Sequence, residues 1–130
     1  MKRSAWIFAR SVGALVTGLL VVAPVTACKD YRSYWVNVTV VNQIGAPVRD
    51  VEVDYPSAGF GINLMATGGV YHYRLKVNGS GKVRVLYPGA MDKPIHLDGP
   101  ELRENEQGEL TITLLPDAKA RFDEHLSMGR

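Results

Sequence analysis

The side chains that could bind a metal or act in catalysis are few and scattered along this 130-residue chain. The histidines, His72, His96 and His125, have no partners at the short spacings typical of zinc sites. A blue-copper centre would need a thiolate beside them, and the single cysteine, Cys28, lies far from all three in sequence. No serine lies in a nucleophile-elbow pattern, and no glycine-rich phosphate loop occurs. The sequence therefore predicts a non-enzymatic protein that needs no metal and no cofactor.

Three carboxylates alternate along one predicted strand, at Asp50, Glu52 and Asp54. They would project from one face about 7 Å apart, a row that could bind a cation. We favour the alternative of a solvated face balanced by basic side chains on neighbouring strands, because cross-strand opposite charges contribute roughly 0.2–1 kcal/mol each. The basic residues available for this are Arg74, Lys76, Lys82 and Arg84.

The lone cysteine, Cys28, follows a segment with the order of an export signal. Basic residues within positions 1–10 precede an uncharged apolar run at residues 12–22. As a helix, this run of about 11 residues would span roughly 17 Å, well short of the ~30 Å hydrocarbon core of a bilayer. We therefore expect residues 1–27 to be a cleaved signal peptide and not a permanent transmembrane helix.

The residues Val25-Thr26-Ala27-Cys28 resemble the lipobox of bacterial lipoprotein signal peptides. The resemblance implies cleavage between Ala27 and Cys28, with acyl chains such as palmitate attached through Cys28. Two or three chains would anchor the protein stably in a membrane, whereas one would bind only marginally. By the same resemblance, Lys29 favours the outer membrane, facing the periplasm, over the inner membrane. The alternative is an ordinary secretory cleavage site that releases a soluble product.

Removal of the leader changes the charge of the protein. The whole chain carries a formal charge of +2, but without Lys2, Arg3 and Arg10 its 15 basic residues fall to 12 against 13 acidic ones, a charge of −1. Nucleic-acid-binding proteins draw their phosphate affinity from clustered lysine and arginine. A balanced mature chain therefore argues against a nucleic-acid partner.

Alternating apolar and polar residues after the leader predict a series of short strands separated by glycine and proline. We expect strands at residues 34–41, 48–55, 60–65, 70–77, 82–87, 95–97 and 109–115. Asn78-Gly79-Ser80-Gly81 should close a hairpin, residues 98–108 should form a loop, and residues 117–126 could form one frayed helix. The prediction is a single antiparallel β-sandwich of six to seven strands. Its expected organisation is a signal peptide at 1–27, a lipidated tether at 28–33, the sandwich at 34–116 and a flexible or weakly helical tail at 117–130.

The stretch from Val40 to Val53, which reads VVNQIGAPVRDVEV, resembles the opening hairpin of carboxypeptidase-regulatory-like and other immunoglobulin-like bacterial domains. The resemblance implies a binding or scaffold module without inherited catalytic residues. Together with the anchor, it predicts a structural or protein-interaction module of the cell envelope, with an envelope protein as its partner.

Aromatic residues leave other functions open. A carbohydrate- or peptide-binding protein could use Tyr71, Tyr73 and Tyr87, although their alternation favours a place in the core. A hydrolase is the less favoured alternative. Near the anchor, Tyr34 and Trp35 either lie in the membrane interface or cover the sandwich.

Replacing Cys28 by serine removes the sulfur to which the lipid would attach. We expect the wild-type protein from its native host to sediment with membranes and to have a mass above that of residues 28–130. The Cys28→Ser variant should lose both properties. Membrane association of the variant, with a mass equal to that of the wild type, would contradict the anchor.

Overall fold

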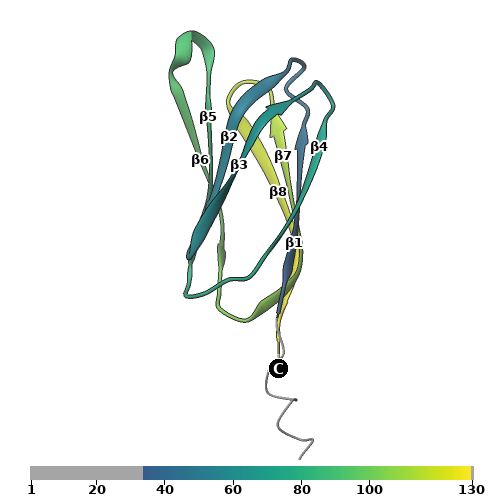
Figure 1. Cartoon of the computed structure of the whole chain (residues 1–130), viewed down its shortest axis with the longest axis vertical. Coiled ribbons are helices and arrows are strands. Elements are labelled where there is room, and N and C mark those ends of the chain that lie inside the picture. Colours follow the sequence, from purple (N-terminus) through teal and green to yellow (C-terminus); the bar gives the residue numbers. More distant parts are fainter. Residues whose placement is uncertain (1–33, 130) are drawn as a thin grey trace, which may run out of the picture. The chain divides into compact units, whose positions relative to one another are not determined.

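The computed structural model describes residues 34–129, which form two four-stranded β-sheets packed face to face (Figure 1). The expected signal peptide and tether, including Ala27 and Cys28, lie outside the described residues. The strands are β1 (Val36–Asn42), β2 (Val48–Tyr55), β3 (Ala58–Met65), β4 (Val70–Leu75), β5 (Gly81–Pro88), β6 (Pro94–Leu102), β7 (Glu106–Leu115) and β8 (Lys119–Met128). A single turn of 3-10 helix, Ala90–Asp92, joins β5 to β6.

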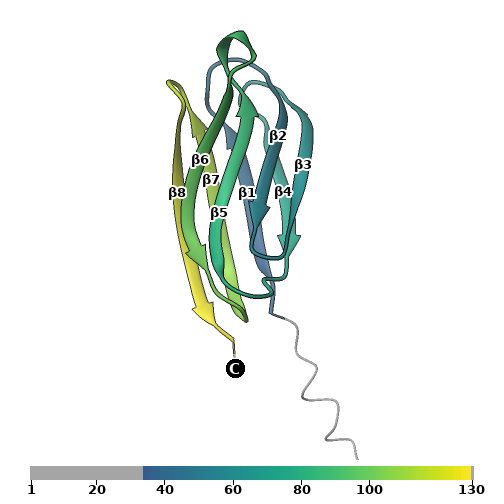
Figure 2. The ribbon, with the colours of Figure 1, turned by 90° about the vertical axis from the view of Figure 1, so that its left-hand side faces the viewer.

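The two sheets have the strand orders β4-β1-β7-β8 and β3-β2-β5-β6, here called sheet A and sheet B. Figure 2 shows sheet B lying over sheet A, with the strands of both sheets running along the long axis of the domain. Neighbouring strands are antiparallel except β1 and β7, which pair in parallel from Val36 opposite Gly108 to Asn42 opposite Leu114.

The strands form where apolar residues recur at every second position, and those residues fill the space between the sheets. In β1, Val36, Val38 and Val40 are fully buried, while the intervening Asn37 is exposed. The same period holds in β7, where Leu110, Ile112 and Leu114 are buried. The inner faces thus form one continuous hydrophobic core of mainly valine, leucine and isoleucine, as the alternation predicts.

Aromatic side chains close both long edges of the sandwich. At one edge the ring of Phe60 on β3 stacks on Tyr73 of β4, with centroids 4.0 Å apart. At the other edge β6 approaches β8, where Phe122 packs against Gly99. A Cβ at Gly99 would lie 2.6 Å from the Phe122 ring, so only glycine permits this approach. These contacts cover the two edges, where no strand of one sheet pairs with a strand of the other.

A buried asparagine holds the connections at one end of the sheets. Asn42, fully buried, donates from its side-chain nitrogen to the carbonyl oxygens of Ala46 (2.9 Å), Met65 (3.3 Å) and Ala66 (3.0 Å). Its side-chain oxygen accepts from the backbone nitrogen of Ile44 at 3.0 Å. One side chain therefore satisfies four backbone groups of two different loops.

The observed sandwich differs in several respects from the prediction. It has eight strands within the described residues instead of six to seven, and the parallel β1–β7 pair makes sheet A mixed. The hairpin expected at Asn78-Gly79-Ser80-Gly81 is wrong, because β4 belongs to sheet A and β5 to sheet B. Residues 76–80 instead cross from one sheet to the other. A connection of this length is sufficient to cross the roughly 10 Å between packed sheets.

The C-terminal third contains more strand than expected. The predicted loop at 98–108 is largely wrong, since β6 continues to Leu102 and β7 begins at Glu106. The predicted helix at 117–126 and the flexible tail at 117–130 are also wrong, because Lys119–Met128 forms β8 and pairs with β7 along its whole length. The domain therefore extends well beyond the expected boundary at residue 116.

Replacing Asn42 by alanine should lower the free energy of unfolding by about 2–3 kcal/mol, because one buried and two part-buried carbonyl groups and one backbone amide would lose a hydrogen-bond partner. Urea denaturation followed by tryptophan fluorescence measures the change. Asn63→Ala, at an exposed position of β3, is the matched control and should change stability by no more than about 0.5 kcal/mol. Equal stability of the two variants would show that the Asn42 hydrogen bonds contribute nothing.

Candidate functional site at the distal end of the sandwich

The described chain begins and ends at the same end of the domain, here called the proximal end. Tyr34 packs so closely against Gly129 that a side chain at Gly129 would overlap its ring. The backbone nitrogen of Gly129 also donates to the carbonyl of Asn105 at 2.8 Å. The opposite, distal end is formed by the connections at residues 43–47, 66–69, 89–93 and 116–118 (Figure 1).

The distal end contains an apolar cavity of about 510 Å³, here called the distal pocket. Three connections and the strand ends beside them enclose it: β1–β2, β5–β6 and β7–β8. Its walls include Ile44, Tyr87, Ile95 and Leu115, and its only carboxylate is Asp117. Sequence reasoning missed this pocket, because its walls come from residues at strand ends and in turns, which a strand pattern does not group together.

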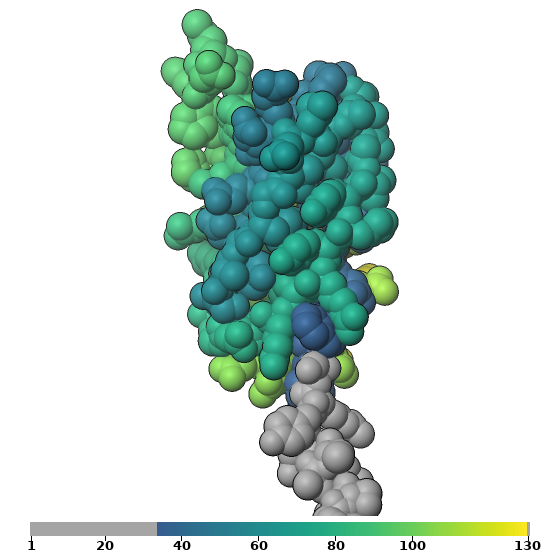
Figure 3. All heavy atoms as spheres, in the orientation of Figure 1, coloured from purple at the N-terminus to yellow at the C-terminus, as the bar shows by residue number. Residues whose placement is uncertain are grey.

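The β5–β6 turn projects past the other connections as a finger, residues 89–93 (Figure 3). It is closed by hydrogen bonds from Gly89 N to Lys93 O (2.7 Å) and from Lys93 N to Ala90 O (3.2 Å). Met91 and Asp92 at its tip both have φ of +57°, a left-handed conformation that is costly for a bulky side chain. Met91 is 91% exposed, so the finger presents a flexible apolar side chain to solvent.

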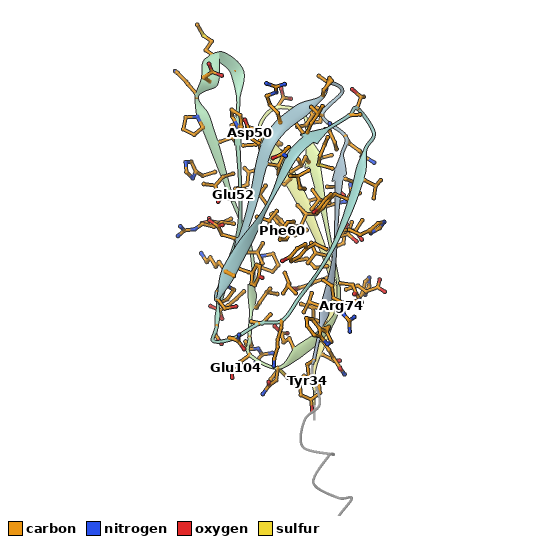
Figure 4. All side chains as sticks on the ribbon, in the orientation of Figure 1. Tyr34, Asp50, Glu52, Phe60, Arg74 and Glu104 are labelled. Atoms are coloured by element: carbon orange, nitrogen blue, oxygen red, sulfur yellow. The ribbon has the colours of Figure 1, made fainter. Side chains whose placement is uncertain are left out.

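A shallower cavity of about 270 Å³, the acidic groove, lies on sheet B beside the finger. Asp50, Glu52 and Asp92 contribute its carboxylates, and Leu86 and Pro94 contribute apolar surface. Figure 4 shows Asp50 and Glu52 on the half of β2 nearer the finger. Asp50 has φ of +53°, and the buried positions of β2 change phase there, from Val48 to Val51. The three predicted carboxylates therefore do not form one regular row.

The structure gives only one of the three predicted carboxylates a basic cross-strand neighbour. Asp54 lies opposite Arg84 in the strand register, although the ion pair that Arg84 forms is with Asp98, at 3.6 Å. Glu52 is instead opposite the apolar Leu86. Of the other predicted basic partners, Lys82 lies farther along β5, opposite Glu101, whereas Arg74 and Lys76 are not on sheet B. The acidic groove is therefore the uncompensated part of this face.

The tyrosines proposed as a ligand platform do not form an exposed aromatic surface. Tyr71 and Tyr73 are half-buried and stack on Phe60, at centroid distances of 6.0 and 4.0 Å. Tyr87 is 6% exposed in the wall of the distal pocket, and burial raises the pKa of its phenol above the ordinary value of 10.0. Burial, and then the neighbouring Tyr73, raise the pKa of Tyr55 in the same direction.

A polar groove of about 510 Å³ runs over the outer face of sheet A. Its polar side chains are Asn37, Thr39, His72, Arg74 and Glu109. Thr39 Oγ1 lies 3.2 Å from His72 Nδ1, which leaves Nε2 of that ring as the nitrogen available to a ligand. This arrangement could hold a polar ligand through hydrogen bonds.

Trp35 lies against the sandwich beside the polar groove. The guanidinium carbon of Arg74 is 4.4 Å from the centroid of its ring, a cation–π contact. Its ring is half-buried in this position. This supports the view that Trp35 covers the sandwich, the alternative to a place in the membrane interface.

The three histidines that were considered as metal ligands are not brought together. His72, His96 and His125 lie on three different strands, β4, β6 and β8. Over residues 34–129, no three His, Cys, Asp or Glu side chains form a group that could hold a metal ion. The same part of the chain contains no helix long and apolar enough to cross a membrane.

Neither a protein family model nor a curated protein sequence matches the chain. Among solved structures, it is similar to the NMR structure of a protein from Eubacterium rectale, with 12% sequence identity and a TM-score of 0.49. The match covers 73% of this chain and 90% of the other. These values are too low to support an inference about function.

The buried Tyr87 phenol makes stability depend on pH in the alkaline range. Its pKa is higher in the folded than in the unfolded chain, so its contribution is complete below pH 10.0 and is lost as pH rises through the folded pKa. We expect the free energy of unfolding to fall above pH 10.0, and to fall less steeply in Tyr87→Phe. At pH 7 the two proteins should differ by less than about 1 kcal/mol. Parallel pH profiles from urea denaturation would refute the assignment.

Proposed function

We propose that the protein is a lipid-anchored, non-enzymatic interaction module of the cell envelope, which binds an envelope protein through its distal end. The observation that supports this most strongly is the pairing of an apolar pocket with a projecting, strained turn whose Met91 is 91% exposed. Apolar surface of this kind, offered to solvent at a loop end, is typical of protein-binding sites.

The tether proposed from the sequence would orient the domain with its distal end away from the membrane. Five residues separate Cys28 from Tyr34, a reach of roughly 17 Å when extended. An acylated Cys28 would therefore keep the proximal end close to the lipid headgroups. The finger and the distal pocket would then face away from the membrane, into the periplasm if the anchor lies in the outer membrane.

Within the sandwich class, we propose a relationship to the carboxypeptidase-regulatory-like domains and not to immunoglobulin domains proper. In an immunoglobulin constant domain the first strand pairs with the second, and the third pairs with the sixth. Here β1 pairs with β4 and β7, and β3 pairs with β2. The pairing of β2 with β5 is common to both arrangements.

A carbohydrate or peptide ligand is the second candidate function. The polar groove on sheet A supports it, because Asn37, Arg74 and Glu109 offer both donors and acceptors of hydrogen bonds. The half-buried Trp35 beside the groove has one face occupied by Arg74. This limits the aromatic stacking that would favour a sugar ring.

Site-specific crosslinking in the native host tests the proposed function. A photoreactive amino acid at position 91 should crosslink to a protein partner, because this side chain is at the tip of the finger. The matched control is position 107, where the exposed Gln107 lies at the proximal end of β7.

The two positions should give different results when the crosslinked products are separated and identified by mass spectrometry. We expect a discrete adduct from position 91 and none of the same mass from position 107. The same adduct from both positions, or no protein adduct from position 91, would refute binding through the distal end.

A further inference from the structure

Resting on the proposed function of the distal end, we infer that its partner is an extended peptide segment that carries an apolar side chain next to lysine or arginine. The distal pocket would take the apolar side chain, and the acidic groove would take the basic one. The chemical difference between these two adjoining cavities is the basis of the inference.

The distal pocket determines the apolar part of the segment. Its walls are the side chains of Ile44, Val48, Ile95 and Leu115, with the ring of Tyr87. A volume of about 510 Å³ is ample for one leucine or phenylalanine side chain of a partner. Because Asp117 is the only charged residue in the wall, a buried polar group would find few partners there.

The acidic groove determines the charge of the segment. The carboxylates of Asp50, Glu52 and Asp92 make no ion pair or hydrogen bond within the described part of the chain. Arg49 and Lys93 are their neighbours in sequence, yet neither forms an ion pair with them. A cationic side chain would supply the missing charge, and an anionic one would be repelled.

The two cavities are close enough for one segment to occupy both. Tyr87 and Pro88, the last two residues of β5, line the distal pocket and the acidic groove alike. The finger follows directly after them and lines both cavities, with Gly89 and Ala90 in the distal pocket and Asp92 in the acidic groove. A segment crossing Pro88 therefore passes from apolar to acidic surface within the space of a few residues.

Selection from a random twelve-residue peptide library displayed on phage tests the inference. The target is the mature protein purified from its native host and immobilised on phosphatidylcholine vesicles, with empty vesicles used to remove lipid-binding phage. We expect the selected peptides to carry lysine or arginine within three positions of an aliphatic or aromatic residue. Peptides that lack basic residues, or that are acidic, would overturn the inference.

Variants of the target locate the bound peptides. Ala90→Phe would fill the mouth of the distal pocket from the exposed side, and Glu52→Lys would reverse a charge in the acidic groove. Each should weaken binding of the selected peptides by about tenfold or more, and higher salt should weaken binding to the wild type. Glu124→Lys makes the same charge change at an exposed position of β8 and should leave affinity unchanged. Equal binding to all three variants would overturn the inference.

Two further outcomes separate this inference from the proposed function. A partner crosslinked through position 91, combined with selected peptides that lack basic residues, would overturn the inference and leave the proposed function standing. Sedimentation of the mature protein tests a second copy as the occupant. Self-association that Ala90→Phe abolishes would overturn the peptide segment in favour of a dimer.

Discussion

The parallel pairing of β1 with β7 is the constraint on which the arrangement of the sandwich depends. It joins residues about 70 positions apart in the chain, from Val36 opposite Gly108 to Asn42 opposite Leu114. Parallel neighbours cannot be joined by a tight turn, so the chain that leaves β1 at the distal end must return to the proximal end, where β7 begins. It does so by building all of sheet B and adding β4 to the far side of β1. The central strands of sheet A consequently run from the proximal to the distal end together.

This arrangement gives the two ends of the domain different chemistry. At the proximal end, Tyr34 and Gly129 pack together, and backbone hydrogen bonds join Trp35 to Gly108 and Gly129 to Asn105. At the distal end, Asn42 holds the loops beside β1, but the finger extends beyond the core and leaves Met91 in solvent. The finger is thus a short exposed turn with a strained backbone, and the pairing of β5 with β6 holds it in that conformation.

Local alternation was enough to predict the strands with one buried face, because the period of two is a property of the strand itself. It failed where the period is interrupted. In β6, the β-bulge near Gly99 and Pro100 has the composition of a loop. In β8, the exposed Glu124 interrupts the alternating apolar residues, which are Ala120, Phe122 and Leu126. Which strands pair depends on contacts between distant residues, and no local pattern contains that information.

The candidate sites likewise differ in whether their residues are consecutive in the sequence or meet only in the folded domain. The resemblance of Val25-Thr26-Ala27-Cys28 to a lipobox rests on four consecutive residues, so the proposal of a lipid anchor could be made from the sequence alone. The distal pocket is not linear, because Ile44, Ile95 and Leu115 meet only after the two sheets have closed. The sequence pointed to two carboxylates of the acidic groove, Asp50 and Glu52, because they alternate along one strand. Asp92 could not be grouped with them, because only the turn of the finger places it beside them.

The position of both ends of the described chain at the proximal end, opposite the finger, has a mechanical consequence. A pull between the start of β1 and a partner held at the finger would act along the strands, since both sheets run in that direction (Figure 2). The ladders that β1 forms with β4 and β7 would then be loaded in shear, with many hydrogen bonds strained at once instead of opening one after another. Such a geometry resists tension along the axis that runs from the proximal end of the domain to the finger.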